Sequence, residues 1–521
     1  MDRQVFLQRI RERREPWDVA VIGGGATGVG VALDAAARGY AVVLLEQSDF
    51  GKGTSSRSTK LIHGGVRYLQ QGNVALVMEA LKERGLLLAN APHLVHDLEF
   101  VVPSYAWWEG PFYGVGLKVY DLLAGKYGFG PSQRLSREAV LERIPTLEQE
   151  GLRGGVKYHD GQFDDSRLLI NLAQTAAEQG ACLLNYAPVI GLIKDPDGLV
   201  TGLQFRDAET GQVHTVPARC VVNATGPFCD TIRRMDDPEA PPMIAPSQGV
   251  HVVLGRRFLP GQTAIMVPHT RDGRVMFALP WHDHVVVGTT DTPINQVRLE
   301  PEPLPHEVDF ILETAGEYLA HRPTRADILS VFTGIRPLVR SGETTHTAAL
   351  SRDHTIDIAK SGLLTITGGK WTTYRKMAED CVDHAIVLGR LPERPCVTRD
   401  LRVHGFHRRA EQFGPLACYG SDAIGLQELM HQQPALAEPL HPSLPIVAAQ
   451  VVWAARHEMA RTVEDVLARR TRALFLNAAA AVAMAPAVAR LLAAELGRDQ
   501  AWQQQQVASF SRTARHFMVQ P

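Results

Sequence analysis

Hydroxyl, cationic and glycine residues are crowded into one short segment, residues 53–69. Three hydroxyl groups and one ammonium there are of the kind that bind a diphosphate, and a pair of glycines would let a flat ring lie against the backbone. A serine-rich surface loop is the alternative interpretation. We expect this segment to hold a phosphate-bearing cofactor through Thr54, Ser55, Ser58, Lys60 and Gly64.

The pattern Gly23-x-Gly25-x-x-Gly28 stands between a short apolar run and an alanine-rich run that favours a helix. Such a turn lets the backbone approach a pyrophosphate at the N-terminus of the helix. Glu46 ends the next apolar run, at the spacing at which a carboxylate binds ribose hydroxyls. The pattern therefore predicts a dinucleotide-binding unit, although it does not separate FAD from NAD.

Short β-runs alternate with helical runs along most of the chain, which predicts an α/β fold with an added antiparallel sheet. The last proline cluster, residues 392–395, is the expected linker to a mostly helical C-terminal region. The expected strands cover residues 18–22, 41–46, 220–223, 251–254, 275–279, 284–288 and 363–367, with one helix ending near residue 39 and others at 165–179 and 370–388.

The composition is that of a globular chain with room for two or three domains: 521 residues, 45% hydrophobic and 21% charged. A net charge of -2 gives no basis for nucleic acid as a partner. The six cysteines form no CxxC pair, so we expect reduced thiols, and no HExxH or close Cys/His set predicts a metal site.

The arginine-rich N-terminal segment lacks the apolar run of a signal peptide. The longest alanine-rich apolar run, residues 478–489, contains Pro486 and is too short to span a bilayer. We therefore expect a cytoplasmic protein without a transmembrane helix.

The run from Ser55 to Leu69, Ser-Ser-Arg-Ser-Thr-Lys-Leu-Ile-His-Gly-Gly-Val-Arg-Tyr-Leu, resembles the signature of FAD-dependent glycerol-3-phosphate dehydrogenases, a branch of the D-amino-acid-oxidase-like flavoproteins. The resemblance extends from about Trp17 to about Leu496. Further segments similar to the family, in the family's order, are residues 223–227, 288–291, 334–338, 351–354, 368–376 and 455–472.

The resemblance implies a Rossmann-like FAD-binding domain, an antiparallel β substrate domain and a helical C-terminal domain. The oxidoreductase region would cover residues 15–390, with FAD-binding parts at about 15–104, 160–235 and 325–390, and the C-terminal domain residues 396–521. The implied reaction is oxidation of sn-glycerol 3-phosphate to dihydroxyacetone phosphate with reduction of FAD, the electrons passing to a quinone.

The resemblance also implies the roles of several side chains. Arg67 and Arg336 would bind the substrate, because a guanidinium matches a phosphate group, and Tyr68 would add a hydroxyl donor. Lys370, at an expected helix start after two glycines, would stabilise negative charge on the reduced flavin. Gln248 stands where some relatives have Lys or Ala, so no electrostatic role of a lysine is expected there.

Oxidation of a carbinol also needs a group that takes the hydroxyl proton, and imidazole has a suitable pKa. His63 is the first candidate and His251 the second. Gly226 would approach the adenosine half of the cofactor, and Val189 its adenine. The full set of expected cofactor contacts is Gly23, Gly25, Gly28, Glu46, Thr54, Ser55, Ser58, Lys60, Leu61, His63, Gly64, Val189, Gly226, Gly369, Lys370 and Thr372, with no metal ligand.

Three other functions stay open on the sequence. The first is an oxidase, in which oxygen takes the electrons in place of a quinone. The second is a flavoprotein that oxidises an amine or amino acid, which would not need two arginines of the phosphate-binding type. The third is a non-catalytic FAD-binding protein, against which the retention of substrate-side motifs argues.

Quinone-linked members of the family attach to one face of the membrane, so the resemblance implies peripheral contact with the inner face of the cell membrane. An oligomer is compatible with the sequence. The candidate surfaces are the N-terminal run Val5-Phe-Leu-x-x-Ile10 with its arginines, and the aromatic stretch Tyr105, Trp107, Trp108, Phe112 and Tyr113 with Lys118. Packing of these aromatics on their own domain is the alternative.

Overall fold

A computed structural model describes residues 1–65, 73–268, 270–271, 273–340 and 353–519. Its first sheet has a parallel centre, in which β18 (Leu364–Gly368), β10 (Val213–Asn223), β1 (Trp17–Ile22), β2 (Val42–Leu45) and β7 (Cys182–Leu184) lie side by side. Antiparallel strands extend it: β17 (His354–Ile358) beside β18, and β9 (Val200–Arg206) with β8 (Val189–Lys194) beside β10.

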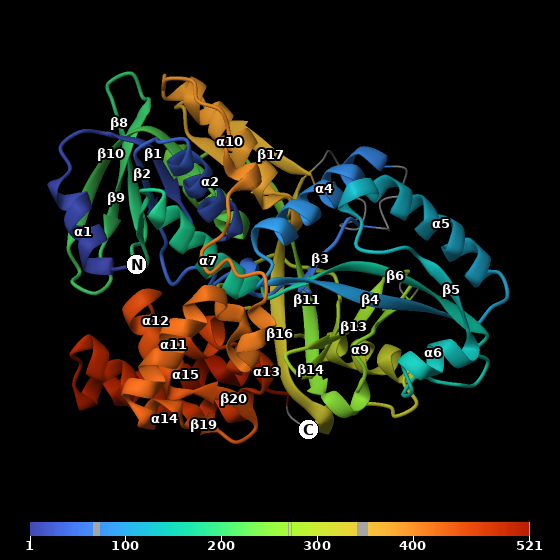
Figure 1. Ribbon diagram of the computed structural model, residues 1–521. Helices are drawn as coiled ribbons and strands as arrows, with labels where there is room; N and C mark the ends of the chain where they lie inside the picture. Colours follow the sequence, from blue (N-terminus) through green and yellow to red (C-terminus); the bar gives the residue numbers. More distant parts are fainter. Residues whose placement is uncertain (66–72, 269, 272, 341–352, 520–521) are drawn as a thin grey trace.

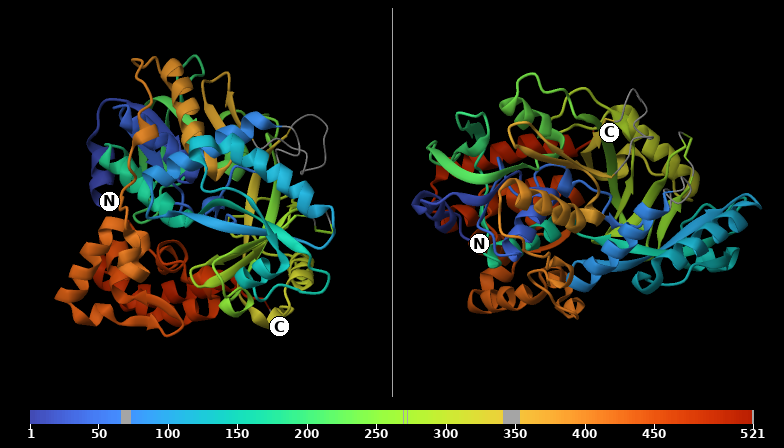
Figure 2. Two further views of the ribbon diagram at one scale, coloured as in Figure 1. Left: turned by 45° about the vertical axis from the view of Figure 1, so that its right-hand side comes forward. Right: turned by 90° about the horizontal axis from the view of Figure 1, so that it is seen from above.

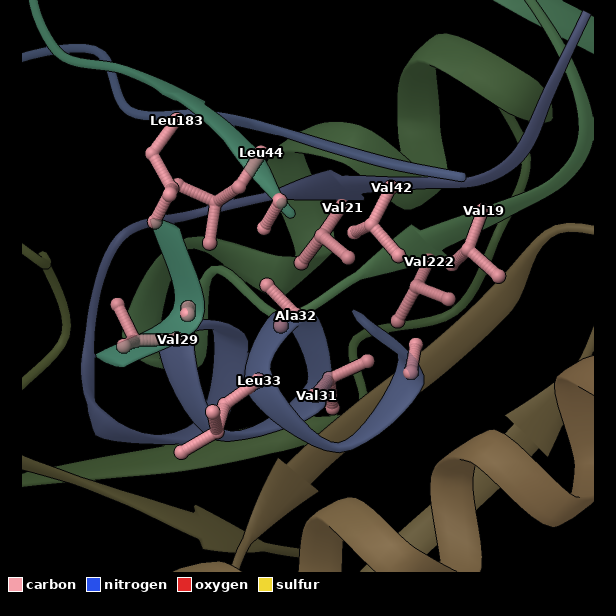
Figure 3. Packing of buried hydrophobic residues seen from close by; sticks show 14 of the residues in the cluster. Val19, Val21, Val29, Val31, Ala32, Leu33, Val42, Leu44, Leu183 and Val222 are labelled. Carbon is pink, nitrogen blue, oxygen red and sulfur yellow. The ribbon is translucent and has the colours of Figure 1, made fainter. Parts of the chain in front are cut away.

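The parallel sheet is covered by protein, and β2 (Val-Val-Leu-Leu), residues 19–22 of β1 and residues 220–222 of β10 are accordingly apolar and buried. Val19 and Val21 are fully buried. Figure 3 shows Ala32 of helix α2 (Ala26–Ala37) beside Val21 of β1. Helices α7 (Asp165–Glu178) and α10 (Tyr374–Leu388) pack against α2 and complete this core.

The second sheet is antiparallel except at one pair, β12 with β4. Its order is β15 (Thr292–Pro293), β11 (Ile244–Gly255), β14 (His284–Gly288), β13 (Met276–Trp281), β12 (Ala264–Val267), β4 (Val95–Ser104), β6 (Gly154–Phe163) and β3 (Leu61–Ile62), with β16 (Ile328–Val339) beside β11 and β5 (Gln133–Ser136) beside β6. Helices α6 (Arg137–Arg143) and α9 (Pro305–Tyr318) contact it, and α4 (Val74–Asn90) and α5 (Glu109–Ala124) lie at its margin (Figures 1 and 2).

The C-terminal region forms a helical domain, drawn orange and red in Figure 1 below the first sheet. It contains α11 (Ala423–Gln432), α12 (Ala448–His457), the π-helical segment Asp465–Arg470, α13 (Ala473–Leu476), α14 (Ala478–Leu496), α15 (Gln500–Ala514) and the hairpin of β19 (Pro439–His441) and β20 (Leu444–Val447). Its core continues into the second sheet through Val253 and Phe332.

This architecture confirms the predicted α/β fold with an antiparallel second sheet and a helical C-terminal region, and the predicted strands lie within observed ones apart from one or two end residues. The structure places two apolar segments about which the sequence raised expectations. The run at 478–489 belongs to the 19-residue helix α14, which is long and apolar enough to cross a membrane by length and composition. In this structure, however, Met484, Val488 and Leu492 of α14 are fully buried in the core of the C-terminal domain.

The N-terminal run is also not a free apolar surface. It forms helix α1 (Arg3–Glu12), whose residues Phe6, Leu7 and Ile10 are buried in the core of the first sheet. The guanidinium of Arg3 binds Asp207 at 2.7 Å with both side chains buried. Packing of α1 against β7 therefore withdraws this segment from membrane contact.

Candidate active site

A first cavity opens at the C-terminal ends of the parallel strands, where Ile22, Leu45 and Ala224 line it. Open α/β sheets bind ligands at this position. The N-terminal turn of α2 also reaches the cavity through Gly25 and Ala26.

Glycine is required at the turn between β1 and α2. Gly23 has a φ of 109°, and a Cβ there would lie 2.7 Å from the carbonyl oxygen of Ala224. A Cβ on Gly28 would lie 1.9 Å from the carbonyl oxygen of Gly23. Gly28 thus allows the helix and the turn to pack closely, while Gly23 and Gly25 line the cavity itself.

Two side chains that line the first cavity form hydrogen bonds with the surrounding backbone. The carboxylate of Glu46 accepts hydrogen bonds from the backbone N–H of Gly24 at 2.6 Å and of Ser48 at 2.9 Å, and burial raises its pKa. The hydroxyl of Ser55 accepts a hydrogen bond from the N–H of Ala26 at 2.9 Å. The wall thus offers a carboxylate, backbone N–H groups and a hydroxyl around the glycine turn.

A second cavity adjoins the first and shares Thr54, Gly368, Gly369 and Lys370 with it. It lies among β3, β11, β16 and the turn before α10. The structure brings the following predicted site residues to the second cavity: Thr54, Ser58, Leu61, His63, His251, Arg336, Gly369, Lys370 and Thr372. The first cavity receives Gly23, Gly25, Glu46, Thr54, Ser55, Val189, Gly226, Gly369 and Lys370.

Arg336 enters the second cavity from β16 with its guanidinium already positioned. Nη1 lies 3.1 Å from Oδ1 of Asp291, and Nη2 donates to the carbonyl oxygen of Thr290 at 2.9 Å. A Cβ on Gly249 would lie 2.3 Å from Nη2, so this glycine in β11 makes room for the guanidinium. The side chain remains 20% exposed, which leaves it accessible to an anionic ligand.

His251 lies in β11 directly opposite Phe332 in β16, and the two rings stack with their centroids 4.8 Å apart. Its Nε2 is 3.0 Å from the hydroxyl of Thr59. Burial holds the pKa of His251 well below its usual range, and the cations of Lys60 and Arg336 lower it further. The imidazole is therefore neutral near pH 7 and has a lone pair that can accept a proton.

Lys60 does not lie where the sequence analysis expected it. Its Nζ binds Oδ2 of Asp165 at 2.6 Å and the carbonyl oxygen of Ser56 at 2.9 Å, the side chain is fully buried, and the residue lines neither cavity. We therefore assign Lys60 to an interior ion pair in place of a diphosphate contact. Ser58 also binds Asp165, at 2.7 Å.

The turn before α10 replaces the helix start expected at Lys370. Gly368 and Gly369 have φ values of 79° and 70°, Lys370 precedes the 3-10 turn Trp371–Thr373, and the α-helix begins at Tyr374. Lys370 thus faces both cavities from a turn. Gly64 lines neither cavity, and its N–H donates to the hydroxyl of Tyr120 at 2.9 Å.

Sequence reasoning missed Arg57, Thr59 and Trp371, which also line the second cavity. Alternation in the second half of the 55–69 motif was the available signal: Thr59, Leu61 and His63 line the cavity, as do Arg57 and Ser58, whereas Lys60 and Ile62 are fully buried. Arg67 and Tyr68 lie outside the described residues.

The two cavities together fit FAD. The glycine turn and the start of α2 suit a pyrophosphate, the carboxylate of Glu46 suits ribose hydroxyls, and the adjoining second cavity leaves space for a ring. Across the described part of the chain, no group of three or more His, Cys, Asp or Glu residues is placed to hold a metal ion.

Known proteins match this chain over nearly its full length. Residues 18–375 match the model of the FAD dependent oxidoreductase family, and residues 364–504 match that of the C-terminal domain of alpha-glycerophosphate oxidase. A mitochondrial glycerol-3-phosphate dehydrogenase of Arabidopsis thaliana is 43% identical over 535 residues, which cover 95% of this chain and 85% of that protein. The human mitochondrial enzyme is 41% identical, with coverage of 96% and 73%.

A solved structure agrees with these relatives. The glycerol-3-phosphate dehydrogenase from Bacillus halodurans, complexed with FAD, has a TM-score of 0.80 and 30% identity, and the match covers 99% of this chain and 97% of that one. L-alpha-glycerophosphate oxidase from Mycoplasma pneumoniae, at 17% identity and a TM-score of 0.56, shares the fold. This chain therefore belongs to the family of FAD-dependent glycerol-3-phosphate dehydrogenases.

Proposed function

We propose that this protein oxidises sn-glycerol 3-phosphate to dihydroxyacetone phosphate, with reduction of bound FAD, and passes the electrons to a quinone. The observation that carries the proposal is the placement of Arg336 beside His251 in a cavity that adjoins the dinucleotide cavity. A cation for a phosphate and a neutral imidazole for a hydroxyl proton are the groups that this oxidation needs.

Arg336 binds the anionic substrate in this proposal. Its contacts with Asp291 and Thr290 hold the guanidinium in one orientation before substrate arrives, so little side-chain entropy is lost on binding. Arg67 and Tyr68, expected to bind the substrate from the 55–69 motif, stay predictions.

FAD, when bound, supplies the hydride acceptor for this reaction. The chain supplies the acceptor of the hydroxyl proton, for which His63 and His251 both line the second cavity. His251 is held by Thr59 and by the ring of Phe332, so its Nε2 keeps a defined direction. Lys370 faces both cavities and contributes positive charge where negative charge develops on the cofactor.

A lipid-soluble acceptor requires contact with a membrane, and α5 offers an apolar surface for it. Trp108, Phe112, Val115, Val119 and Leu122 follow helical spacing and are exposed, with Trp107 just before them. We call Trp107, Trp108, Phe112, Val115, Val119 and Leu122 the α5 apolar face. Peripheral binding through this face would place the protein on the inner side of the cell membrane.

The aromatic residues expected to form one exposed surface divide into an exposed group and a buried group. Trp107 and Trp108 are 78% and 45% exposed, whereas Tyr113 is buried. The hydroxyl of Tyr105 donates to the carbonyl oxygen of Glu148 at 2.9 Å, and the ammonium of Lys118 donates to that of Ser132 at 2.6 Å. Tyr105 and Tyr113 therefore pack on their own domain, while the tryptophans and Phe112 face outward.

One experiment tests the proposed function: anaerobic reduction of the FAD-loaded protein by sn-glycerol 3-phosphate, followed by reoxidation with menadione or with oxygen. We expect bleaching of the flavin spectrum with this substrate and not with glycerol or alanine, and faster reoxidation by menadione than by oxygen. Arg336→Ala should retain FAD and require at least tenfold more substrate for reduction, because it removes a charge-assisted contact worth about 1.5–3 kcal/mol. Bleaching by alanine alone, or rapid reoxidation by oxygen alone, would contradict the proposal.

A further inference from the structure

A buried carboxylate, that of Glu307, lies on helix α9, which packs against the second sheet. The residue is 1% exposed and lines neither the first nor the second cavity. Transfer of a carboxylate from water into a protein interior is costly unless hydrogen bonds replace its hydration. The groups that supply these hydrogen bonds therefore show which segments the carboxylate holds together.

Four donors meet the carboxylate of Glu307. Oε2 accepts hydrogen bonds from the backbone N–H of Leu304 at 2.9 Å and from Nε2 of Gln248 at 2.6 Å. Oε1 accepts hydrogen bonds from the hydroxyls of Thr290 at 3.1 Å and Thr292 at 2.5 Å. Gln248 belongs to β11, whereas the two threonines follow β14. One side chain of α9 thus joins two segments of the second sheet.

The same two segments hold the guanidinium of Arg336. Nη1 donates to the carbonyl oxygen of Gln248 at 3.3 Å, and Nη2 donates to the carbonyl oxygen of Thr290 at 2.9 Å and to the hydroxyl of Thr289 at 3.1 Å. Gln248 and Thr290 therefore each bind the buried carboxylate through the side chain and the guanidinium through the backbone. Two short connections lead from the carboxylate to the cation of the second cavity.

The register of the strands brings these groups together. Gln248 pairs with Thr292 of β15 on one side of β11 and with Ile335 of β16 on the other. The hydroxyl of Thr290 also accepts a hydrogen bond from the N–H of Val250 at 2.9 Å, which ties the segment after β14 to β11. A shift of this segment would move the oxygens that orient the guanidinium, because the same residues make both sets of contacts.

We propose that Glu307 is a positioning residue of the substrate site, which keeps the guanidinium of Arg336 in the orientation that binds the phosphate of the substrate. This inference rests on the proposed function, in which Arg336 binds the anionic substrate. Affinity rises when the groups that bind a ligand are held in place beforehand, because less side-chain freedom is lost on binding. Loss of the Glu307 carboxylate should therefore raise KM and leave kcat unchanged.

The test uses full-length, FAD-loaded protein and Glu307→Gln, which keeps the size of the side chain and replaces one acceptor oxygen by a donor amide. The KM of sn-glycerol 3-phosphate should rise about tenfold at unchanged kcat, which is the upper end of what immobilising one flexible side chain contributes. The Kd of inorganic phosphate, measured by calorimetry without substrate, should rise by the same factor. The matched control is Glu313→Gln on the exposed side of α9, which should leave both values unchanged.

A double-variant cycle tests whether Glu307 acts through Arg336. Arg336→Ala removes the guanidinium, so in its presence Glu307→Gln should change KM by less than about twofold, as expected for two residues that act through one contact. Thr292→Val removes one of the four donors at a partly exposed position and should raise KM about threefold, the value of a modest hydrogen bond.

The outcomes separate the positioning role from the function. If wild-type protein is neither reduced by sn-glycerol 3-phosphate nor binds phosphate, the proposed function is wrong. If wild-type protein is reduced but Glu307→Gln keeps the wild-type KM and Kd, or raises KM equally with and without Arg336, the assignment of Glu307 is wrong. A fall in kcat at unchanged KM also contradicts it. FAD content and melting temperature identify a misfolded Glu307→Gln variant, in which case Thr292→Val decides.

Discussion

The ammonium of Lys60 lies 2.6 Å from the carboxylate of Asp165, and both side chains are fully excluded from solvent. Burial lowers the pKa of Lys60 to about 7, although Asp165 opposes the shift. Asp165 also accepts a hydrogen bond from Nη2 of Arg472 at 3.0 Å, so it joins the 55–69 motif to the C-terminal domain. The Lys60–Asp165 pair anchors the 55–69 motif in the protein interior, while the residues on either side of Lys60 line the second cavity.

Asp165→Asn should destabilise the protein strongly, because it removes the carboxylate paired with buried Lys60 and leaves buried Arg472 with Asp164 as its remaining acidic partner. Breaking a buried ion pair costs about 3–5 kcal/mol. Differential scanning fluorimetry measures the melting temperature. The control is Glu317→Gln, which removes an exposed partner of Arg271 and should cost about 1 kcal/mol or less. Equal melting temperatures for the two variants would show that the buried ion pair does not stabilise the fold.

Gly28→Ala should abolish tight FAD binding. In an ordinary helix this change stabilises by about 1 kcal/mol, but here the added Cβ would lie 1.9 Å from the carbonyl oxygen of Gly23. Absorbance at the flavin band of the purified protein gives the FAD content. Gly255→Ala is the control, because no atom lies within 4 Å of a Cβ at that position. A Gly28→Ala protein with full FAD content would show that the turn tolerates a side chain.

Thr59→Val should lower kcat/KM roughly 5- to 100-fold, because loss of a hydrogen bond to a buried polar group costs about 1–3 kcal/mol. The hydroxyl oxygen of Thr59 accepts from the charged form of His251, so its removal lowers the pKa of His251 and moves the acid limb of the kcat/KM profile to lower pH. Thr59→Ser should restore the wild-type profile. An unchanged profile in Thr59→Val would exclude His251 as the proton acceptor and favour His63.

His404 should stabilise the protein in a pH-dependent way. Burial lowers its pKa, but Asp422 and Glu178 outweigh burial and raise it to about 9. Because the folded pKa lies above the unfolded value, the stabilisation is complete below pH 6.5 and is lost as the pH rises through about 9. His404→Gln should therefore lower the melting temperature at pH 6 and have little effect at pH 10. An equal loss at both pH values would contradict the assignment.

Trp107→Ser combined with Trp108→Ser should weaken binding to anionic vesicles, since these two side chains belong to the α5 apolar face and are exposed. Flotation of full-length protein with vesicles at low salt measures the bound fraction. Val387→Ser removes a 76% exposed apolar side chain on α10 and should leave binding unchanged. If wild-type protein does not rise with the lipid, the proposed membrane contact is wrong.

Features set by neighbouring residues could be predicted from the sequence. The apolar run of β1, the glycine turn and the alanine-rich helix α2 follow from local backbone preferences, and the observed bounds differ from the expected ones by a residue or two. The family motifs led to the FAD-binding fold and to residues that line two adjoining cavities. Local sequence thus determined the class of fold and the class of chemistry.

The direction of each side chain depended on contacts between distant segments. Lys60 and Thr59 are adjacent, yet Lys60 pairs with Asp165 inside the protein and Thr59 contacts His251 in the second cavity. Helix α1 buries its apolar residues against β7, and α14 buries its own in the C-terminal core. The sequence by itself determined which residue types are present at the site, whereas the tertiary structure decided which of them face a cavity, because burial and charge pairing are settled by partners that lie far apart in the chain.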